Sequence, residues 1–254
     1  MRLTFLGTGT SGGVPMIACT CPVCLSTDSR DKRLRSSVMI EANGTTLIVD
    51  SGPDFRQQML REKVMRIDGI IYTHPHKDHT GGLDDIRAYN YILRRDMPLY
   101  LDAFTESEIR DQYSYIFSPN PYPGIPRVQL HRIDGDTPFV AEGIPVIPIK
   151  AMHHQMPVLG FRFGDITYIT DANYIAPEEI EKIKGTRILV LNALRREQHI
   201  SHFTLQQAID LIQYIKPERA YLTHISHQLG KYEDVSQELP EGIFLAYDGL
   251  SIEV

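Results

Sequence analysis

The sequence predicts an α/β protein in which two β-sheets pack face to face and helices cover both outer faces. The chain has 254 residues, 42% of them hydrophobic, which suits one large α/β domain spanning residues 1–254. Each half of the chain runs from strands to helices, and layer rules permit two such halves to form a helix-covered sandwich. No run of about 18 apolar residues occurs, so the sequence predicts no transmembrane helix.

The first half begins with a strand at 3–6 and a Gly-rich loop at 7–13. This loop lacks the Gly-Lys-Ser/Thr ending of a phosphate-binding loop, so we expect its glycines to let the backbone pass close to a functional site. Asn43-Gly44 marks a hairpin turn between two strands. The other predicted elements of this half are strands at 37–41, 45–49, 69–73 and 99–101, and helices at 54–61, 82–95 and 105–117.

The second half opens after a Pro-rich loop at 118–126, which we interpret as a break within the domain because strands resume beyond it. A helix at 177–183 carries Pro in its first turn, and Thr204 is a suitable N-cap for an amphipathic helix at 204–215. The strands predicted in this half lie at 128–133, 144–149, 158–163, 166–169, 187–191, 220–222 and 244–246.

Charge and composition restrict the partners of the chain. The net charge is -6 and no block of Lys or Arg occurs, whereas tight binding to duplex nucleic acid needs a basic stripe. The sequence therefore disfavours a nucleic acid partner. The N-terminus lacks the apolar region and cleavage site of a signal peptide, so we expect a cytoplasmic protein with no membrane association.

The most informative pattern is His-Pro-His-Lys-Asp-His at 74–79, directly after the predicted buried strand at 69–73. Imidazole nitrogens and carboxylate oxygens are ligands of borderline divalent metals such as Zn²⁺. Alternate side chains of a loop that leaves a strand can point together, as we expect for His74 and His76, whereas Asp78 and His79 would fold back toward a second point. The spacing therefore predicts two metal ions rather than one.

A second cluster holds all three cysteines, Cys19, Cys21 and Cys24, within six residues. In a cytoplasmic chain such a cluster is interpreted first as a set of metal ligands. A tetrahedral structural Zn²⁺ needs one more ligand, and the sequence contains no fourth cysteine. The fourth ligand must then be a histidine, for which His227 is the best candidate. An iron–sulfur cluster is disfavoured because such clusters prefer four cysteines.

The motif His74-x-His76-x-Asp78-His79 resembles the HxHxDH signature of the metallo-β-lactamase-fold hydrolases. This resemblance implies a four-layer αββα sandwich with two metals at one edge. It also implies a further histidine after the strand at 144–149, where His153 and His154 compete. His153 is favoured because His-x-x-x-Pro-x-x-Gly-Phe resembles homologues that have a single histidine at its first position.

The resemblance extends to the remaining donors of a dinuclear site holding two divalent metals, Zn or Mn. Tyr168-Ile169-Thr170-Asp171 resembles the segment with the bridging carboxylate, and Leu222-Thr223-His224 resembles the segment with the last ligand. The implied assignment is His74, His76 and His153 on one metal, and Asp78, His79 and His224 on the other, with Asp171 between them.

The segment 193–204 resembles the family loop that offers a general acid. His202 precedes a predicted helix and is our choice for protonating the leaving oxygen, since an imidazole with a pKa near 6.5 suits that task. His199 is the alternative. We count Asp78 with these two histidines among the catalytic residues, in addition to its role as a ligand.

The cysteine cluster narrows the resemblance to the PhnP-like branch, cyclic phosphodiesterases that carry a Cys₃His zinc site beside the dinuclear centre. The branch implies a phosphodiesterase that acts on a small phosphodiester, cyclic phosphates included, through attack of a metal-bound hydroxide. Three alternatives stay open: a thioesterase or lactonase, a tRNA 3′-processing nuclease, and a metal-binding protein without activity. The family also allows a homodimer.

Overall fold

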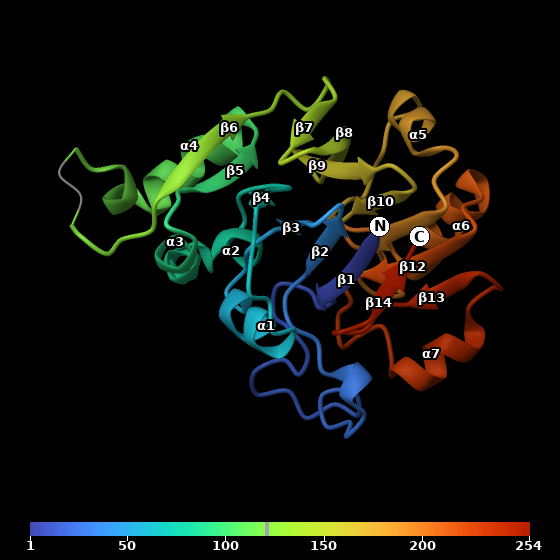
Figure 1. Cartoon of the computed structure of the whole chain (residues 1–254). Helices are drawn as coiled ribbons and strands as arrows, with labels where there is room; N and C mark the ends of the chain where they lie inside the picture. The colour runs from blue at the N-terminus through green and yellow to red at the C-terminus, as the bar shows by residue number, and fades with distance from the viewer. Residues whose placement is uncertain (120–121) are drawn as a thin grey trace.

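Two seven-stranded β-sheets pack face to face, and helices cover the outer face of each (Figure 1). The computed structural model describes residues 1–119 and 122–254, so positions 120 and 121 of the predicted Pro-rich loop lie outside the described residues. The predicted α/β class and the αββα order of layers are confirmed. Within the described ranges, none of the helices combines the length and the apolar character that a bilayer crossing requires.

The first sheet is built mainly from the N-terminal half and is closed at one edge by the last strand of the chain. Its strands, in spatial order, are β14 (Ser251–Glu253), β1 (Arg2–Gly7), β2 (Ser37–Ala42), β3 (Thr45–Val49), β4 (Gly69–Ile71), β5 (Met97–Leu101) and β6 (Val128–Arg132). Its helices are α1 (Phe55–Arg61), α2 (Lys77–Thr80), α3 (Arg87–Leu93) and α4 (Ala103–Gln112).

The second sheet is built from the C-terminal half. Its strands, in spatial order, are β13 (Ile243–Leu245), β12 (Arg219–Thr223), β11 (Ile188–Asn192), β10 (Ile166–Ile169), β9 (Met156–Phe163), β8 (Ile144–His153) and β7 (Phe139–Ala141). Its helices are α5 (Pro177–Ile183), α6 (Leu205–Ile215) and α7 (Tyr232–Glu238). Thr204 caps α6 as predicted, and Gln207 completes a capping box.

Apolar side chains form three core layers. These layers separate the four backbone layers of the sandwich, which are helices, sheet, sheet and helices. The layer between the sheets contains Phe5, Phe161 and Tyr168. One outer layer packs α1, α3 and α4 on the first sheet, and the other packs α5, α6 and α7 on the second sheet. The central strands β4, β5, β10 and β11 are buried on both faces, whereas the edge strands β6 and β14 keep exposed residues.

Several element boundaries differ from the sequence prediction. The predicted helix at 82–95 is a 3₁₀ turn (Leu83–Ile86) followed by α3, and the predicted helix at 105–117 ends at Gln112, before a 3₁₀ turn (Ser114–Phe117). Strand β8 extends beyond residue 149 to His153, because its last residues pair with the start of β9. The hairpin turn is confirmed, since Asn43 and Gly44 both adopt positive φ, 52° and 78°.

The ends of several strands carry polar residues in an uncommon backbone conformation. Asp50 follows β3, Asp171 lies just beyond β10 and His224 follows β12, with φ of 66°, 53° and 55°. Non-glycine residues rarely adopt this left-handed conformation, and it concentrates at functional sites. The strands therefore direct these three side chains toward one edge of the sandwich.

Candidate metal centres

The structure brings the predicted donors of the dinuclear site into two adjoining groups. Within each group, one potential ligand atom per residue lies within 4.8 Å of the others. The first group is His74, His76 and His153, and the second is Asp78, His79, Asp171 and His224. The four donors of residues 74–79 follow β4 and enter α2. The other three come from β8 (His153) and from the ends of β10 (Asp171) and β12 (His224).

Asp171 lies between the two groups and offers one oxygen to each. Its Oδ1 is 2.9 Å from His224 Nδ1 and 3.4 Å from His79 Nε2. Its Oδ2 is 3.8 Å from His74 Nε2 and 3.3 Å from His202 Nε2. A carboxylate with this placement can contact two cations at once.

His79 shows that the donor set fits a divalent cation. Its Nδ1 donates to Asp50 Oδ2 at 2.7 Å, so Nε2 is the ring nitrogen that faces the cluster. The buried Nε2 has no hydrogen-bond partner among the described residues, although Asp78 Oδ2 lies 3.2 Å away. A ring nitrogen buried beside carboxylate oxygens needs positive charge between them, and a divalent cation such as Zn²⁺ or Mn²⁺, which takes nitrogen and oxygen donors, would supply it here.

Asp50 is a functional residue that the sequence prediction missed. Its carboxylate is fully buried and accepts from the Thr73 amide at 2.9 Å and from the Thr73 hydroxyl at 2.8 Å, besides His79. The Thr73 hydroxyl in turn lies 2.9 Å from His74 Nδ1. One carboxylate thus orients one histidine of each group, directly or through Thr73. The sequence feature that could have identified Asp50 is its position, because it is a single acidic residue directly after an apolar strand.

The charges of the site depend strongly on burial and on one another. Burial acts to lower the pKa of His79, but Asp171, Asp78 and Asp50 raise it well above its ordinary value. Burial acts to raise the pKa of Asp171, but His224 and His79 hold it well below its ordinary value. Burial lowers the pKa of His74, with a further decrease from His79. The cluster therefore balances buried carboxylates against buried imidazoles.

Geometry distinguishes His153 from His154 as the histidine that joins the first donor group. His153 groups with His74 and His76, and its Nδ1 lies 2.9 Å from the carbonyl of Ser201, which leaves Nε2 free. His154 is exposed, lies outside this group and adopts a φ of 59°. The structure thus directs the first histidine of the pair into the site.

His202 and His199 lie beside the two groups, on the loop before α6. His202 is buried and its Nε2 faces Asp171, while its Nδ1 lies 3.2 Å from Nδ1 of the more exposed His199. Burial lowers the pKa of His202 to about 4, despite a hydrogen bond to Asp171 that raises it. The surroundings of His202 therefore favour the neutral ring in the free protein.

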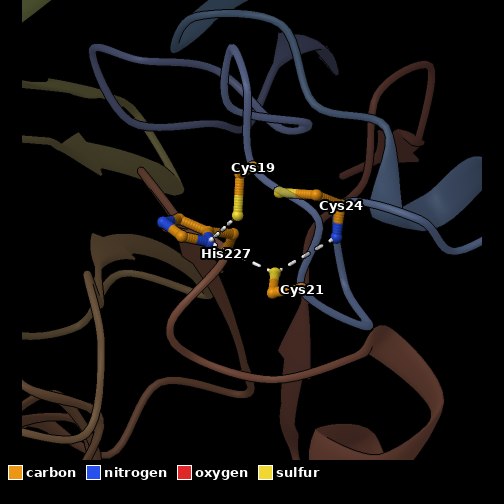
Figure 2. A group of neighbouring side chains, drawn as sticks. All are labelled: Cys19, Cys21, Cys24 and His227. Carbon is orange, nitrogen blue, oxygen red and sulfur yellow. Dashed lines mark hydrogen bonds between the residues drawn. The ribbon is translucent and has the colours of Figure 1, made fainter.

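The three cysteines and His227 form a separate cluster (Figure 2). Cys19 Sγ and Cys21 Sγ each lie 3.4 Å from His227 Nδ1. Zn–S bonds of about 2.3 Å and Zn–N bonds of about 2.0 Å place tetrahedral donors about 3.5 Å apart, so this donor set fits Zn²⁺. A backbone hydrogen bond from Cys24 is the main reason that the pKa of Cys21 falls to about 6, whereas burial raises the pKa of Cys24 to about 11.

Comparison with solved structures places this fold and site among known proteins. A solved structure described as a diphosphatase of the PhnP family is 40% identical, with a TM-score of 0.93 over 100% of this chain and 97% of that chain. Zn²⁺-bound PqqB from Methylobacterium extorquens is 20% identical, with a TM-score of 0.80 over 100% of both chains, and therefore shows similarity of fold.

Comparison with curated proteins and with family models leads to the family. An octanoyltransferase from Porphyromonas gingivalis is 41% identical over 98% of this chain, and the chain spans 51% of that relative's length. Coenzyme PQQ synthesis protein B of Methylobacterium radiotolerans is 32% identical over 34% of each chain. The model of the beta-lactamase superfamily domain matches residues 45–225. The chain therefore belongs to the beta-lactamase superfamily, and over its whole length it is similar to a member of the PhnP family.

Proposed function

We propose that this protein is a metal-dependent hydrolase that cleaves a P–O bond in a small phosphodiester, cyclic phosphates included. The observation that carries the proposal is the pair of donor groups joined by Asp171, with the unpartnered His79 Nε2 aimed into the cluster. His74, His76 and His153 would hold one divalent metal, and Asp78, His79 and His224 the other. When bound, two such metals lower the pKa of a water molecule and neutralise charge that develops on phosphoryl oxygens.

The role of His202 is to supply a proton to the leaving oxygen. Its Nε2 is the ring nitrogen that faces the cluster, and His199 lies on its other side, toward solvent. The ring is neutral in the free protein, but an anionic phosphodiester beside it would raise its pKa and favour the protonated form. Bound substrate would thus favour the protonated form of His202, which is the form that can protonate the leaving oxygen.

The similarity to a PhnP-family diphosphatase supports P–O chemistry and adds a second bond to test, the bridge of a substituted diphosphate. Both reactions place negative charge on phosphoryl oxygens, so the same donors serve both. The net charge of -6 and the compact chain disfavour a large nucleic acid, and we expect no processing of a tRNA 3′ trailer.

A second candidate is hydrolysis of an acyl ester or thioester. It is favoured by the P. gingivalis relative, whose name describes acyl transfer by a protein about twice as long as this chain. The same donors can polarise a carbonyl group and stabilise the oxyanion that attack on it creates.

Hydrolysis assays with matched substrates separate these candidates. The substrates are bis(p-nitrophenyl) phosphate, diadenosine diphosphate and p-nitrophenyl octanoate, each tested with Zn²⁺ or Mn²⁺ and with a chelator. We expect chelator-sensitive cleavage of a phosphorus substrate, which Asp171→Asn abolishes by removing the charge shared between the groups. Octanoate hydrolysis alone would favour the acyl candidate, and full metal loading without any cleavage would contradict both.

A further inference from the structure

The cysteine cluster and the dinuclear site share one short segment of chain. His224 and His227 are three residues apart, directly after β12, and each belongs to a different donor group. Ile225 between them pairs with the N-terminal loop, since its amide donates to Thr8 O at 2.8 Å and its carbonyl accepts from the Thr10 amide at 3.1 Å. Any movement of residues 225–227 therefore acts directly on the backbone of His224.

The N-terminal loop at 9–24 is attached to this segment at both ends. At one end Gly9 bridges to Ile225, and at the other the cysteines surround His227, as Figure 2 shows. The first end also reaches His224, because Ser36 Oγ donates to Gly9 O and lies 3.2 Å from His224 Nδ1. The cysteine cluster thus anchors one end of the loop at 9–24, and the other end of this loop is linked through Ser36 to the predicted metal ligand His224.

Two of the three cysteines are arranged for disulfide formation. Cys21-Pro22-Val23-Cys24 has the Cys-x-x-Cys spacing of redox-active dithiols, and the Cys24 amide donates to Cys21 Sγ at 3.4 Å. Cys21 is partly exposed, so a small oxidant can reach it, whereas Cys24 is buried. Cys19 and Cys21 are two residues apart, a spacing that would close a tighter and more strained disulfide ring.

We propose that Cys21 and Cys24 are an oxidative modification site whose disulfide releases the metal of the Cys₃His cluster and weakens metal binding around His224. This inference rests on the proposed function only in assuming that His224 helps to bind a metal. Formation of this disulfide by peroxide would inactivate the dinuclear site reversibly.

The reaction needs a hydroperoxide as the oxidant and balances as a two-electron step. The Cys21 thiolate attacks the peroxide, which cleaves the O–O bond, gives a sulfenic acid and releases hydroxide or an alkoxide. Cys24 sulfur then displaces hydroxide from the Cys21 sulfenic acid and forms the S–S bond. Two thiolates are consumed, so the cluster keeps only Cys19 and His227 as donors, too few to retain a structural Zn²⁺.

The test uses the full chain loaded with Zn²⁺ in the cysteine cluster and Mn²⁺ in the dinuclear site, treated with stoichiometric hydrogen peroxide. We expect a mass loss of 2 Da, a Cys21–Cys24 disulfide in peptide maps and release of the zinc to a chromogenic chelator. Mn²⁺ retained after gel filtration should fall, with an affinity loss of about tenfold or more at one of its two positions. A dithiol reductant with added Zn²⁺ should restore all three readouts.

A matched control separates the thiol chemistry from general damage to the loop. Leu25→Ala removes an exposed side chain beside the cluster, keeps all four donors and should respond as the wild type does. Retention of zinc after peroxide, a different cysteine pairing, or unchanged Mn²⁺ affinity after zinc release would each overturn the inference. Because no readout is hydrolysis, a protein that binds three metals but cleaves no phosphodiester would contradict only the proposed function.

Discussion

Asp50 shows how one buried residue sets the direction of two histidines in the candidate metal site. Its Oδ2 accepts hydrogen bonds from His79 Nδ1 and from the Thr73 hydroxyl. Because the Thr73 hydroxyl gives its one proton to Asp50, it acts as the acceptor toward His74 Nδ1. Both imidazoles therefore use Nδ1 for these hydrogen bonds and present Nε2 to the cluster as the atom available to a metal. Such outer partners fix ring orientation and raise the basicity of the ligand.

Replacing Asp50 with Asn tests this arrangement. One carboxylate oxygen becomes an NH₂ group, which cannot accept from His79 or from Thr73, so we expect metal affinity to fall about 10- to 100-fold. Titration of the chelator-stripped protein with Mn²⁺ measures the change. Asp68→Asn is the matched control, because Asp68 is equally buried but holds Thr46 and Arg95, remote from the donors. Equal losses in both variants would contradict the role of Asp50.

His202 can be tested through the leaving group. A general acid matters most when the departing oxygen is a poor leaving group, so His202→Ala should slow cleavage of an alkyl phosphodiester about 10²- to 10⁴-fold. Cleavage of bis(p-nitrophenyl) phosphate should fall much less, because p-nitrophenolate leaves without protonation. His199→Ala is the comparison variant, and metal content is measured for both. An equal loss on both substrates would assign His202 a structural role instead.

At the level of secondary structure, residues of the candidate metal site lie where strands end. The left-handed conformations of Asp50, Asp171 and His224 end β3, β10 and β12 abruptly and turn each side chain toward the same edge. One glycine, Gly52, allows the segment beyond β3 to pack closely against its neighbour. A Cβ atom on Gly52 would lie 2.0 Å from the carbonyl oxygen of Asp78, so the loop after β3 touches the backbone of the HxHxDH segment.

The substitution Gly52→Ala tests whether this contact positions Asp78. The added methyl group must displace the Asp78 backbone, so we expect weaker metal binding together with a lower free energy of unfolding. Gly12→Ala is the control, because a Cβ there meets only Met16 Cγ at 3.9 Å and the site is exposed. Mn²⁺ titration and denaturant unfolding report the two effects. Normal metal affinity in Gly52→Ala would show that the contact is dispensable.

For the whole molecule, sequence reasoning was most successful where chemistry or a long apolar run marked a segment. The four residues of the HxHxDH motif and the three cysteines meet their predicted neighbours from distant parts of the chain. Helix α7 was missed because its sequence is polar and buries only Val235, and the three-residue β7 and β14 are too short for a pattern. Asp50 was missed because its partners, His79 and Thr73, are known only after folding.

The metals should also stabilise the whole chain. The buried carboxylates and imidazoles would bind metal in the folded protein, and such linkage contributes about 2.7 kcal/mol when free metal is 100-fold above its Kd. We expect chelation to lower Tm, and the Tm of the loaded protein to rise with the logarithm of free metal concentration. Differential scanning calorimetry measures this dependence. A Tm that is independent of metal would contradict binding at these donors.

Anomalous diffraction from crystals grown with Zn²⁺, recorded at the zinc edge, tests the central claim most directly. The account predicts two peaks within the cluster around Asp171, about 3.5–4 Å apart, and a third among Cys19, Cys21, Cys24 and His227. A single peak or no peak around Asp171 would contradict the dinuclear site, and with it the proposed hydrolysis.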